Sequence, residues 1–267
     1  MKFENLICER AGAVLKVTMN RPAKLNSLST GLLRDLAACA DAITQDAAIR
    51  AAVLTGAGRS FCAGADLTDP DSIPKPGQSP GQHVEQALRH SFHPVLLKWT
   101  RLSVPVVVAV NGIAAGAGVS LALAGDITLA ARSATFAVLF APKLGLVPDM
   151  GATHLLPSRI GAARARYLAL TGETIDATRA EQIGLIAETV ADDQLSARSD
   201  ALAAQLAAGP TQAFLTVREL LDGGATRTLA EQIEFEANAQ HRMADSPDFL
   251  EGVTAFREKR AARFRGR

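Results

Sequence analysis

Apolar and polar residues alternate near the start of the chain. Residues 13–19, AVLKVTM, follow this two-residue period and predict a strand with one buried face. A hairpin partner is expected near Phe3–Cys8. Ser29 or Thr30 then precedes a helical pattern and is a typical N-cap residue. The inner face of this helix is expected to carry Leu32, Leu33, Leu36 and Ile43.

Three later runs are apolar without alternation, which is typical of strands buried on both faces. These runs are IRAAVLTG (49–56), PVVVAV (105–110) and DITLAA (126–131). The order along the chain is strand, helix, strand, loop, strand, helix, strand. This order predicts a layered α/β core.

Two further segments have a different composition. Residues 68–82, TDPDSIPKPGQSPGQ, are rich in Pro, Gly and Ser, and the strand and helix rhythm resumes on both sides of them. We therefore expect a mobile loop or lid there rather than a linker between domains. From about residue 162 the pattern is helical, and the chain ends in a basic helix or tail.

The charge balance and the cysteines limit the class of protein. There are 28 basic and 27 acidic residues among 267, which gives no support to nucleic-acid binding. The three cysteines are far apart and have neither metal-ligand spacing nor a disulfide framework, as suits a reducing cytoplasm. The first ten residues lack a signal-peptide pattern, and no apolar run is a good membrane span. We expect a cytoplasmic protein with no membrane or nucleic-acid partner and no metal.

Two turns that carry almost no side chains are the first candidates for chemistry. AAGAGVSLALAGD (114–126) opens an apolar helical run, and GRSFCAGADL (58–67) follows a buried strand. Small residues at a helix start serve close packing, but they also let a ligand oxygen reach free N–H groups. Two such turns can direct two N–H groups at one oxygen, which is the arrangement of an oxyanion hole.

The same residues carry a family resemblance. SFCAGADL together with PVVVAVNGIAAGAGVSLALAGDITLAA resembles the crotonase, or enoyl-CoA hydratase/isomerase, superfamily. Further matching stretches are VTMNRPAKLNSLS, GLVPDMGATHLLP, RARYLALTGETIDATRAEQIGLI and FREKRAARF. The resemblance implies a spiral of ββα units over residues 1–200 and a C-terminal helical trimerisation region over residues 201–267.

The resemblance also implies the substrate and how it is held. Acyl-CoA thioesters would be the substrates, with coenzyme A as part of the substrate rather than a separate cofactor. The N–H groups of Ala65 and Ala117 would form the oxyanion hole. The protein would be a homotrimer or a dimer of trimers. Residues implied in substrate or CoA binding are Lys24, Leu25, Ala63, Asp66, Leu67, Gly116, Phe256 and Lys259.

Some of these residues have simpler interpretations that stay open. Lys24 can equally be a solvated loop lysine, and Asp66 can order its own turn. Phe256 and Lys259 match a tail that often contacts CoA on a neighbouring subunit, but a basic helix end is also favoured by the helix dipole.

The acid groups separate the possible reactions. The hydratase branch uses two glutamates, and the matching positions here hold Ser120 and either Phe140 or Ala141. Ser120 is interpreted as a small polar filler. One acid remains nearby, Asp149, among apolar or small neighbours that would raise its pKa. A turn aspartate is the alternative, but several isomerase branches of the superfamily place an aspartate at this position.

Three functions remain at this point. The first is an acyl-CoA isomerase in which Asp149 moves a proton between two carbons of a thioester held by the oxyanion hole. The second is an enoyl-CoA hydratase that uses Asp149 and water. The third is a non-catalytic acyl-CoA-binding subunit, which the loss of both glutamates would allow.

Overall fold

The chain begins with an antiparallel hairpin. The computed structural model describes residues 1–266, and in it β1 (Leu6–Ala11) pairs with β2 (Val14–Met19). The alternating residues of β2 are buried on one side, as the period predicts. The strand at 13–19 is therefore confirmed, and its partner begins and ends about three residues later than expected.

The apolar runs form the middle of a six-stranded sheet with the order β1-β2-β3-β5-β7-β10. The three apolar runs form β3 (Ala51–Gly56), β5 (Val106–Val110) and β7 (Ile127–Ala131). The last strand of the sheet is β10 (Glu188–Val190). From β2 to β10 every neighbouring pair is parallel. Strands buried on both faces need no alternation, which explains their continuous apolar sequence.

A second sheet consists of short strands. Its order is β4-β6-β8-β9, with β4 (Ser60–Cys62), β6 (Ile113–Ala115), β8 (Thr135–Ala137) and β9 (Thr174–Asp176). Each of β4, β6 and β8 directly follows a strand of the large sheet, and helices then lead to the next pair. This repetition is the spiral of ββα units.

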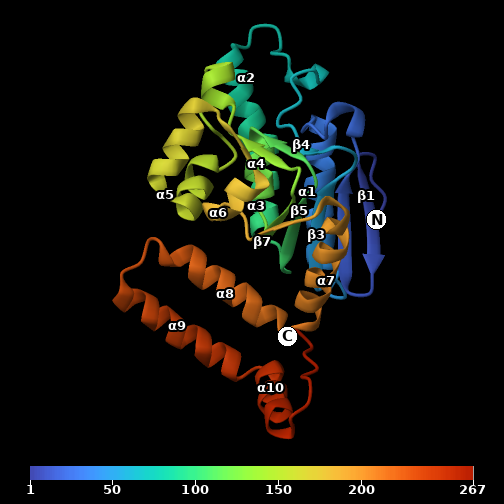
Figure 1. The fold of residues 1–267 in the computed structure, drawn as a ribbon, viewed down its shortest axis with the longest axis vertical. Helices are drawn as coiled ribbons and strands as arrows, with labels where there is room; N and C mark the ends of the chain where they lie inside the picture. The colour runs from blue at the N-terminus through green and yellow to red at the C-terminus, as the bar shows by residue number, and fades with distance from the viewer. Residues whose placement is uncertain (267) are drawn as a thin grey trace.

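The helices of the core pack on the sheets or on one another. They are α1 (Thr30–Gln45), α2 (Pro80–Ala87), α3 (His93–Thr100), α4 (Ala117–Ala122), α5 (Ala152–Thr171), α6 (Ala177–Gln182) and α7 (Leu195–Ala208). Of these, α2 lies at the end farthest from the C-terminal helices (Figure 1). Short 3₁₀ turns lie at Pro22–Lys24, Pro70–Ser72 and Asp192–Gln194, and π-helical turns at Leu88–Phe92 and Phe140–Leu144.

Helix α1 forms as its sequence predicts. The Ser29 hydroxyl accepts a hydrogen bond from the Leu32 N–H, so Ser29 is the N-cap. The four apolar residues expected on the inner face are all buried. Trp99 of α3 donates its indole N–H to the Leu36 carbonyl at 3.1 Å, which joins the two helices.

Two expectations about the connections need correction. The segment 68–82 is not all loop, because Ser79 and Gln82 form a capping box and α2 begins at Pro80. The helical region does not start near residue 162, because α5 already begins at Ala152. A left-handed Gly161 (φ 77°) interrupts α5, and this break hid its first half from the periodicity.

Three C-terminal helices extend away from the sheets (Figure 1). They are α8 (Thr211–Gly224), α9 (Leu229–Ala244) and α10 (Pro247–Glu258), which confirms the helical pattern of this region. The division at residue 200 stays a prediction. That residue lies within α7, which packs on β3, β5 and β7, so the helices that leave the core begin at α8.

Two of the three cysteines lie close together. The sulfur atoms of Cys8, on β1, and Cys39, on α1, are 4.0 Å apart. Residues 31 positions apart in the sequence thus meet where α1 packs on the first strand.

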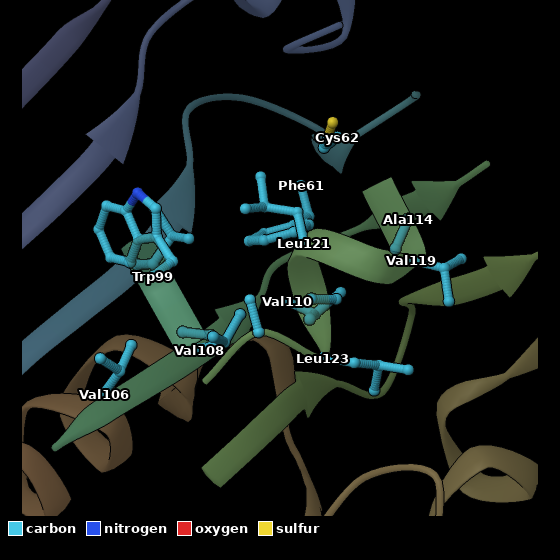
Figure 2. Packing of buried hydrophobic residues seen from close by; sticks show 14 of the residues in the cluster. Phe61, Cys62, Trp99, Val106, Val108, Val110, Ala114, Val119, Leu121 and Leu123 are labelled. Atoms are coloured by element: carbon cyan, nitrogen blue, oxygen red, sulfur yellow. The ribbon is translucent and has the colours of Figure 1, made fainter. Parts of the chain in front are cut away.

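The core surrounds α4. Figure 2 shows Val119, Leu121 and Leu123 among the valines of β5 and Phe61 of β4, and all belong to one cluster of buried residues. Burial therefore fixes α4 on the sheets. Among residues 1–266, no helix is long and apolar enough to span a membrane.

Candidate active site

The first turn without side chains is held by the segment before α1. Ala63 donates its N–H to the Leu25 carbonyl at 3.1 Å, and Leu28 donates to the Gly64 carbonyl at 2.8 Å. Asp66 then donates to the Leu28 carbonyl at 3.1 Å. These bonds alternate along the turn, so the N–H of Ala65 points away from this partner segment.

The small residues bring this turn against the start of α4. A Cβ atom at Gly118 would lie 2.1 Å from the Cys62 carbonyl oxygen, so only glycine fits there. A Cβ at Gly64 would lie 2.9 Å from the Ala115 oxygen and 3.6 Å from the Ala117 nitrogen. Close packing and access to N–H groups are thus the same feature, because the glycines let the two turns meet.

Two N–H groups at this meeting point have no protein acceptor. Within the described part of the chain, neither Ala65 nor Ala117 donates its N–H in a hydrogen bond. Ala117 is the first residue of α4, where a helix leaves its N–H groups free. Gly116 precedes it with a left-handed φ of 53° and donates to the Ala137 carbonyl at 2.9 Å. The two candidate oxyanion-hole residues therefore lie on adjoining turns with free donors.

Asp149 lies on the loop that leads into α5. Its Oδ1 atom is shielded from solvent and has no hydrogen-bond partner among the residues of the described chain. Burial raises the pKa of Asp149 to about 6. A turn aspartate would bond its own backbone instead, so this carboxyl group has the environment of a proton-transfer group.

The loop of Asp149 is attached to α4. Ser120 donates its hydroxyl to the Asp149 carbonyl at 3.1 Å, and Ser120 is fully buried. The sequence interpretation of Ser120 as a filler missed this bond, since no local pattern links residues 29 positions apart.

The second hydratase glutamate position is apolar. Phe140 is buried at the start of a π-helical turn, and a Cβ at Gly116 would lie 3.8 Å from its ring. Ala141 follows in the same turn. Neither Ser120 nor these residues supply a carboxylate.

Several of the residues that the family resemblance implies in CoA binding lie on or beside the segment before α1. Leu25 and Ala63 are joined by the hydrogen bond above, and Gly116 opens α4. Lys24 is exposed, with its ammonium group 3.2 Å from the Thr68 hydroxyl. Leu67 is also exposed.

Asp66 is used within the protein. Its carboxylate binds Arg21 at 2.8 Å and accepts from the backbone N–H and the hydroxyl of Thr68. Burial acts to raise the pKa of Asp66, but the hydrogen bonds from Thr68 and Arg21 hold it below its usual value. This carboxylate therefore orders the turn.

Phe256 and Lys259 are not brought to this site within one chain. Both lie at the end of α10, which is well separated from α4 and α2 in Figure 1. Phe256 is 84% exposed. A CoA contact from these residues would require a neighbouring subunit.

An apolar cavity lies between α2 and the loop of Asp149. Its volume is about 410 Å³, and Leu146 of the loop forms one wall. The other lining residues are Pro80, Gly81, Val84, Glu85, Leu88, Arg89 and His93. Helix α2 rather than the segment before it therefore shapes this space.

The structure thus combines spiral ββα units, two adjoining turns with free N–H groups and an acid whose pKa is raised by burial. The family model described as enoyl-CoA hydratase/isomerase matches residues 9–267. The chain belongs to the enoyl-CoA hydratase/isomerase family.

The chain resembles relatives named as isomerases and relatives named as hydratases. It is 41% identical, over 95% of both chains, to the 1,2-epoxyphenylacetyl-CoA isomerase of Escherichia coli (strain K12). It is 40% identical, over the full length of both, to a protein of Rhodobacter capsulatus named "Probable enoyl-CoA hydratase". The crystal structure of an enoyl-CoA hydratase from Bacillus anthracis matches with a TM-score of 0.90 at 33% identity, covering 99% of this chain and 100% of that one.

Proposed function

We propose that the protein is an acyl-CoA isomerase. The thioester oxygen lies between the N–H groups of Ala65 and Ala117, which makes the carbon next to the carbonyl acidic. Asp149 removes a proton from the acyl chain, and the enolate oxygen accepts both N–H bonds. Asp149 then returns the proton to another carbon, so the double bond moves and no atom is gained or lost.

One observation carries this proposal: the Asp149 carboxyl is partly buried on a loop bonded to α4, and its Oδ1 atom is shielded from solvent with no hydrogen-bond partner among the described residues. With a pKa of about 6, it is mostly ionised at neutral pH and can accept a proton. A single acid/base group is sufficient for an isomerase. Hydration needs a group that activates water as well, and the two glutamate positions hold Ser120 and an apolar residue.

The acyl group is expected to be apolar. Val84, Leu88 and Leu146 line the cavity beside the Asp149 loop, which suits a hydrocarbon or an aromatic ring. The similarity to the Escherichia coli isomerase supports the ring 1,2-epoxide of phenylacetyl-CoA as one substrate. With such a substrate the same site would assist opening to the oxepin.

Hydration of an enoyl-CoA is the second candidate, since a full-length relative carries that name. Crotonyl-CoA, a 3-enoyl-CoA and the ring epoxide distinguish the two reactions when each is incubated with the purified protein. Turnover of the last two supports isomerisation, whereas turnover of crotonyl-CoA alone supports hydration. Tight binding of all three without turnover would instead identify a non-catalytic subunit.

Asp149→Asn tests the role of the acid directly. We expect the rate of proton exchange from the acyl chain into D₂O to fall by about 10²–10⁴-fold. The wild-type rate in this variant would refute the assignment of Asp149.

A further inference from the structure

We propose that Ser120 is a positioning residue that fixes the Asp149 loop relative to the oxyanion hole. This inference rests on the proposed function. Ser120 is three residues after Ala117, so both lie on one side of α4, one helical turn apart. The same short helix thus supplies an N–H group for the thioester oxygen and a hydroxyl for the main chain of the base.

The two sides of Asp149 differ in burial. Leu144, Leu146 and Val147 before it are exposed, whereas Met150 after it is fully buried, and the Ser120 bond is a further attachment of the loop to the core. After Asp149, Met150 (φ 46°) and Gly151 (φ 70°) are both left-handed, which is unfavourable for a methionine.

The Asp149 carbonyl accepts two hydrogen bonds with different effects. The Ala152 N–H donates to it at 3.0 Å, but Ala152 belongs to the same loop and helix start. The Ser120 hydroxyl is the donor that comes from α4. Because the carbonyl and the side chain share one residue, holding the carbonyl on α4 limits where the carboxyl group can lie.

The variant Ser120→Ala removes the donor and leaves the charge of the site unchanged. We expect kcat to fall by about tenfold, since small misplacement of a catalytic group reduces rate strongly. KM for the acyl-CoA should stay within about twofold, because the free N–H groups remain. In an Asp149→Asn background the same change should cost less than about twofold.

Thr128→Val is a matched control. Thr128 is also buried and donates its hydroxyl to a carbonyl of α4, that of Ala122, at 2.8 Å. It should lower the melting temperature about as much as Ser120→Ala and leave kcat unchanged. If Ser120→Ala does not fold, Ser120→Cys, which is similar in size but a weak donor, replaces it.

The possible results distinguish a failure of the positioning role from a failure of the proposed function. A wild-type kcat in Ser120→Ala, with Asp149→Asn inactive, overturns the positioning role alone. A wild-type rate in Asp149→Asn overturns the proposed function. An equal loss of kcat in Ser120→Ala and Thr128→Val assigns the effect to stability and also overturns the positioning role.

A separate observation carries a second proposal. We propose that Cys8 and Cys39 are a dithiol that a low-molecular-weight disulfide oxidises to an intramolecular disulfide. Their sulfurs are 4.0 Å apart, Cys8 is partly exposed and Cys39 is buried behind it. β1 is the edge strand of its sheet and pairs only with β2. A small shift of β1 that brings the two sulfur atoms together therefore disrupts hydrogen bonds to no other strand.

The two thiols have different roles in the reaction. The hydrogen bond with Cys39 lowers the pKa of Cys8, which favours its thiolate. The Cys8 thiolate attacks the external disulfide, forms a mixed disulfide and releases one thiolate. Cys39 loses its proton and attacks the Cys8 sulfur, which releases the second thiol. The external disulfide is reduced to two thiols as the two cysteines are oxidised.

Glutathione disulfide is the probe for this proposal. After incubation and acid quench, the intact mass should fall by that of two hydrogen atoms, and digestion should yield the Cys8–Cys39 peptide pair. Cys39→Ser should stop at the glutathione adduct on Cys8, and Cys8→Ser should not react.

Cys62→Ser is the control and should behave as wild type. Cys62 is fully buried and burial raises the pKa of its thiol to about 12. A wild-type protein that remains unmodified, or that stops at the Cys8 adduct, would overturn the proposal.

Discussion

Asp149 sets the pH range of the proposed reaction. Its carboxyl group must be ionised to take a proton, and burial raises its pKa to about 6. We predict that kcat/KM falls as the pH decreases through about 6, because the protonated acid cannot act as a base. Initial rates with a 3-enoyl-CoA between about pH 5 and pH 8 measure this. A flat profile across this range would contradict the role of Asp149.

The same burial makes Asp149 unfavourable for stability at neutral pH. The folded state holds its proton more tightly than the unfolded state, whose carboxyl has the ordinary value of 3.8. The contribution of Asp149 to the stability of the wild type is therefore more favourable below pH 3.8 than above pH 6. Because part of the carboxyl group reaches solvent, the difference is well below the ~3 kcal/mol that the full shift would give.

Asp149→Asn removes this titration. We predict a higher melting temperature than wild type at pH 8 and a smaller difference at pH 4, measured by circular dichroism. Glu173→Gln, an exposed position on the chain after α5, is the control and should show neither effect. A variant less stable than wild type at pH 8 would show that the carboxylate contributes contacts beyond its charge.

At the scale of residues, local chemistry could be predicted and long-range contacts could not. The lone acid in an apolar stretch indicated Asp149, and burial does raise its pKa in the structure. The Ser120 bond and the contact between Cys8 and Cys39 have no local signal in the sequence. Their partners are about 30 positions away, and only the packing of helices on sheets brings them together.

At the scale of elements, the proposed oxyanion hole depends on the fit of α4 against β4. Gly118→Ala would place a methyl group 2.1 Å from the Cys62 oxygen, so α4 must move. We predict a loss of kcat of about 10² or more, because the Ala117 N–H moves with the helix. The free energy of unfolding should fall by about 1–3 kcal/mol from overpacking. Steady-state kinetics and urea unfolding measure the two effects.

Gly252→Ala is the matched control for this change. Gly252 is also within a helix, α10, but a Cβ there would meet only Phe264 at 3.5 Å, an ordinary contact. This variant should be as stable as wild type or more so, because alanine favours a helix by up to about 1 kcal/mol. Wild-type kcat in Gly118→Ala would show that the N–H of Ala117 is not needed.

The sequence predicted long elements well and short ones poorly. The apolar runs, the cap at Ser29 and the C-terminal helices have patterns several residues long, and all are confirmed. The strands β4, β6, β8 and β9 have three residues each, too few to show a period. The helices that begin at Pro80 and Ala152 were hidden by Pro and Gly residues, which usually end helices but here lie at a first turn or a kink.

At the scale of the whole molecule, Arg218 joins the C-terminal helices to the core. Its guanidinium group, on α8, binds both carboxylate oxygens of Asp126, at 2.6 and 2.7 Å. It also donates to the carbonyls of Leu102 and Val104. We predict that Arg218→Met lowers the free energy of unfolding by about 1–3 kcal/mol, because the partly exposed Asp126 carboxylate and two backbone carbonyls lose a charged donor.

Hydrogen exchange locates this effect. The amides of α8 should exchange faster in Arg218→Met, while those of β3 and β5 stay protected. Arg198→Met is the control, since Arg198 pairs with Glu188 at the surface and should cost less than about 1 kcal/mol. Equal losses in both variants would show that the Arg218 pair is no stronger than a surface pair.

The C-terminal helices expose many large apolar side chains. The exposed residues on α8, α9 and α10 include Leu221, Leu229, Ile233, Phe249, Leu250 and Phe256. A trimer, as the family resemblance implies, would bury such faces. It would also carry Phe256 and Lys259 of one chain to the CoA end of the next site. Light scattering is therefore expected to give three or six times the mass of one chain.

Mixed oligomers test whether subunits share sites. Lys259→Ala should raise KM for acyl-CoA by up to about tenfold and leave kcat unchanged, because the residue would hold CoA and not the reacting carbons. Subunits of this variant refolded together with Asp149→Asn subunits should regain some sites of wild-type KM. In those sites an intact Asp149 faces an intact Lys259 from a neighbour. If mixing leaves KM at the value of Lys259→Ala alone, the tail serves its own chain or no CoA at all.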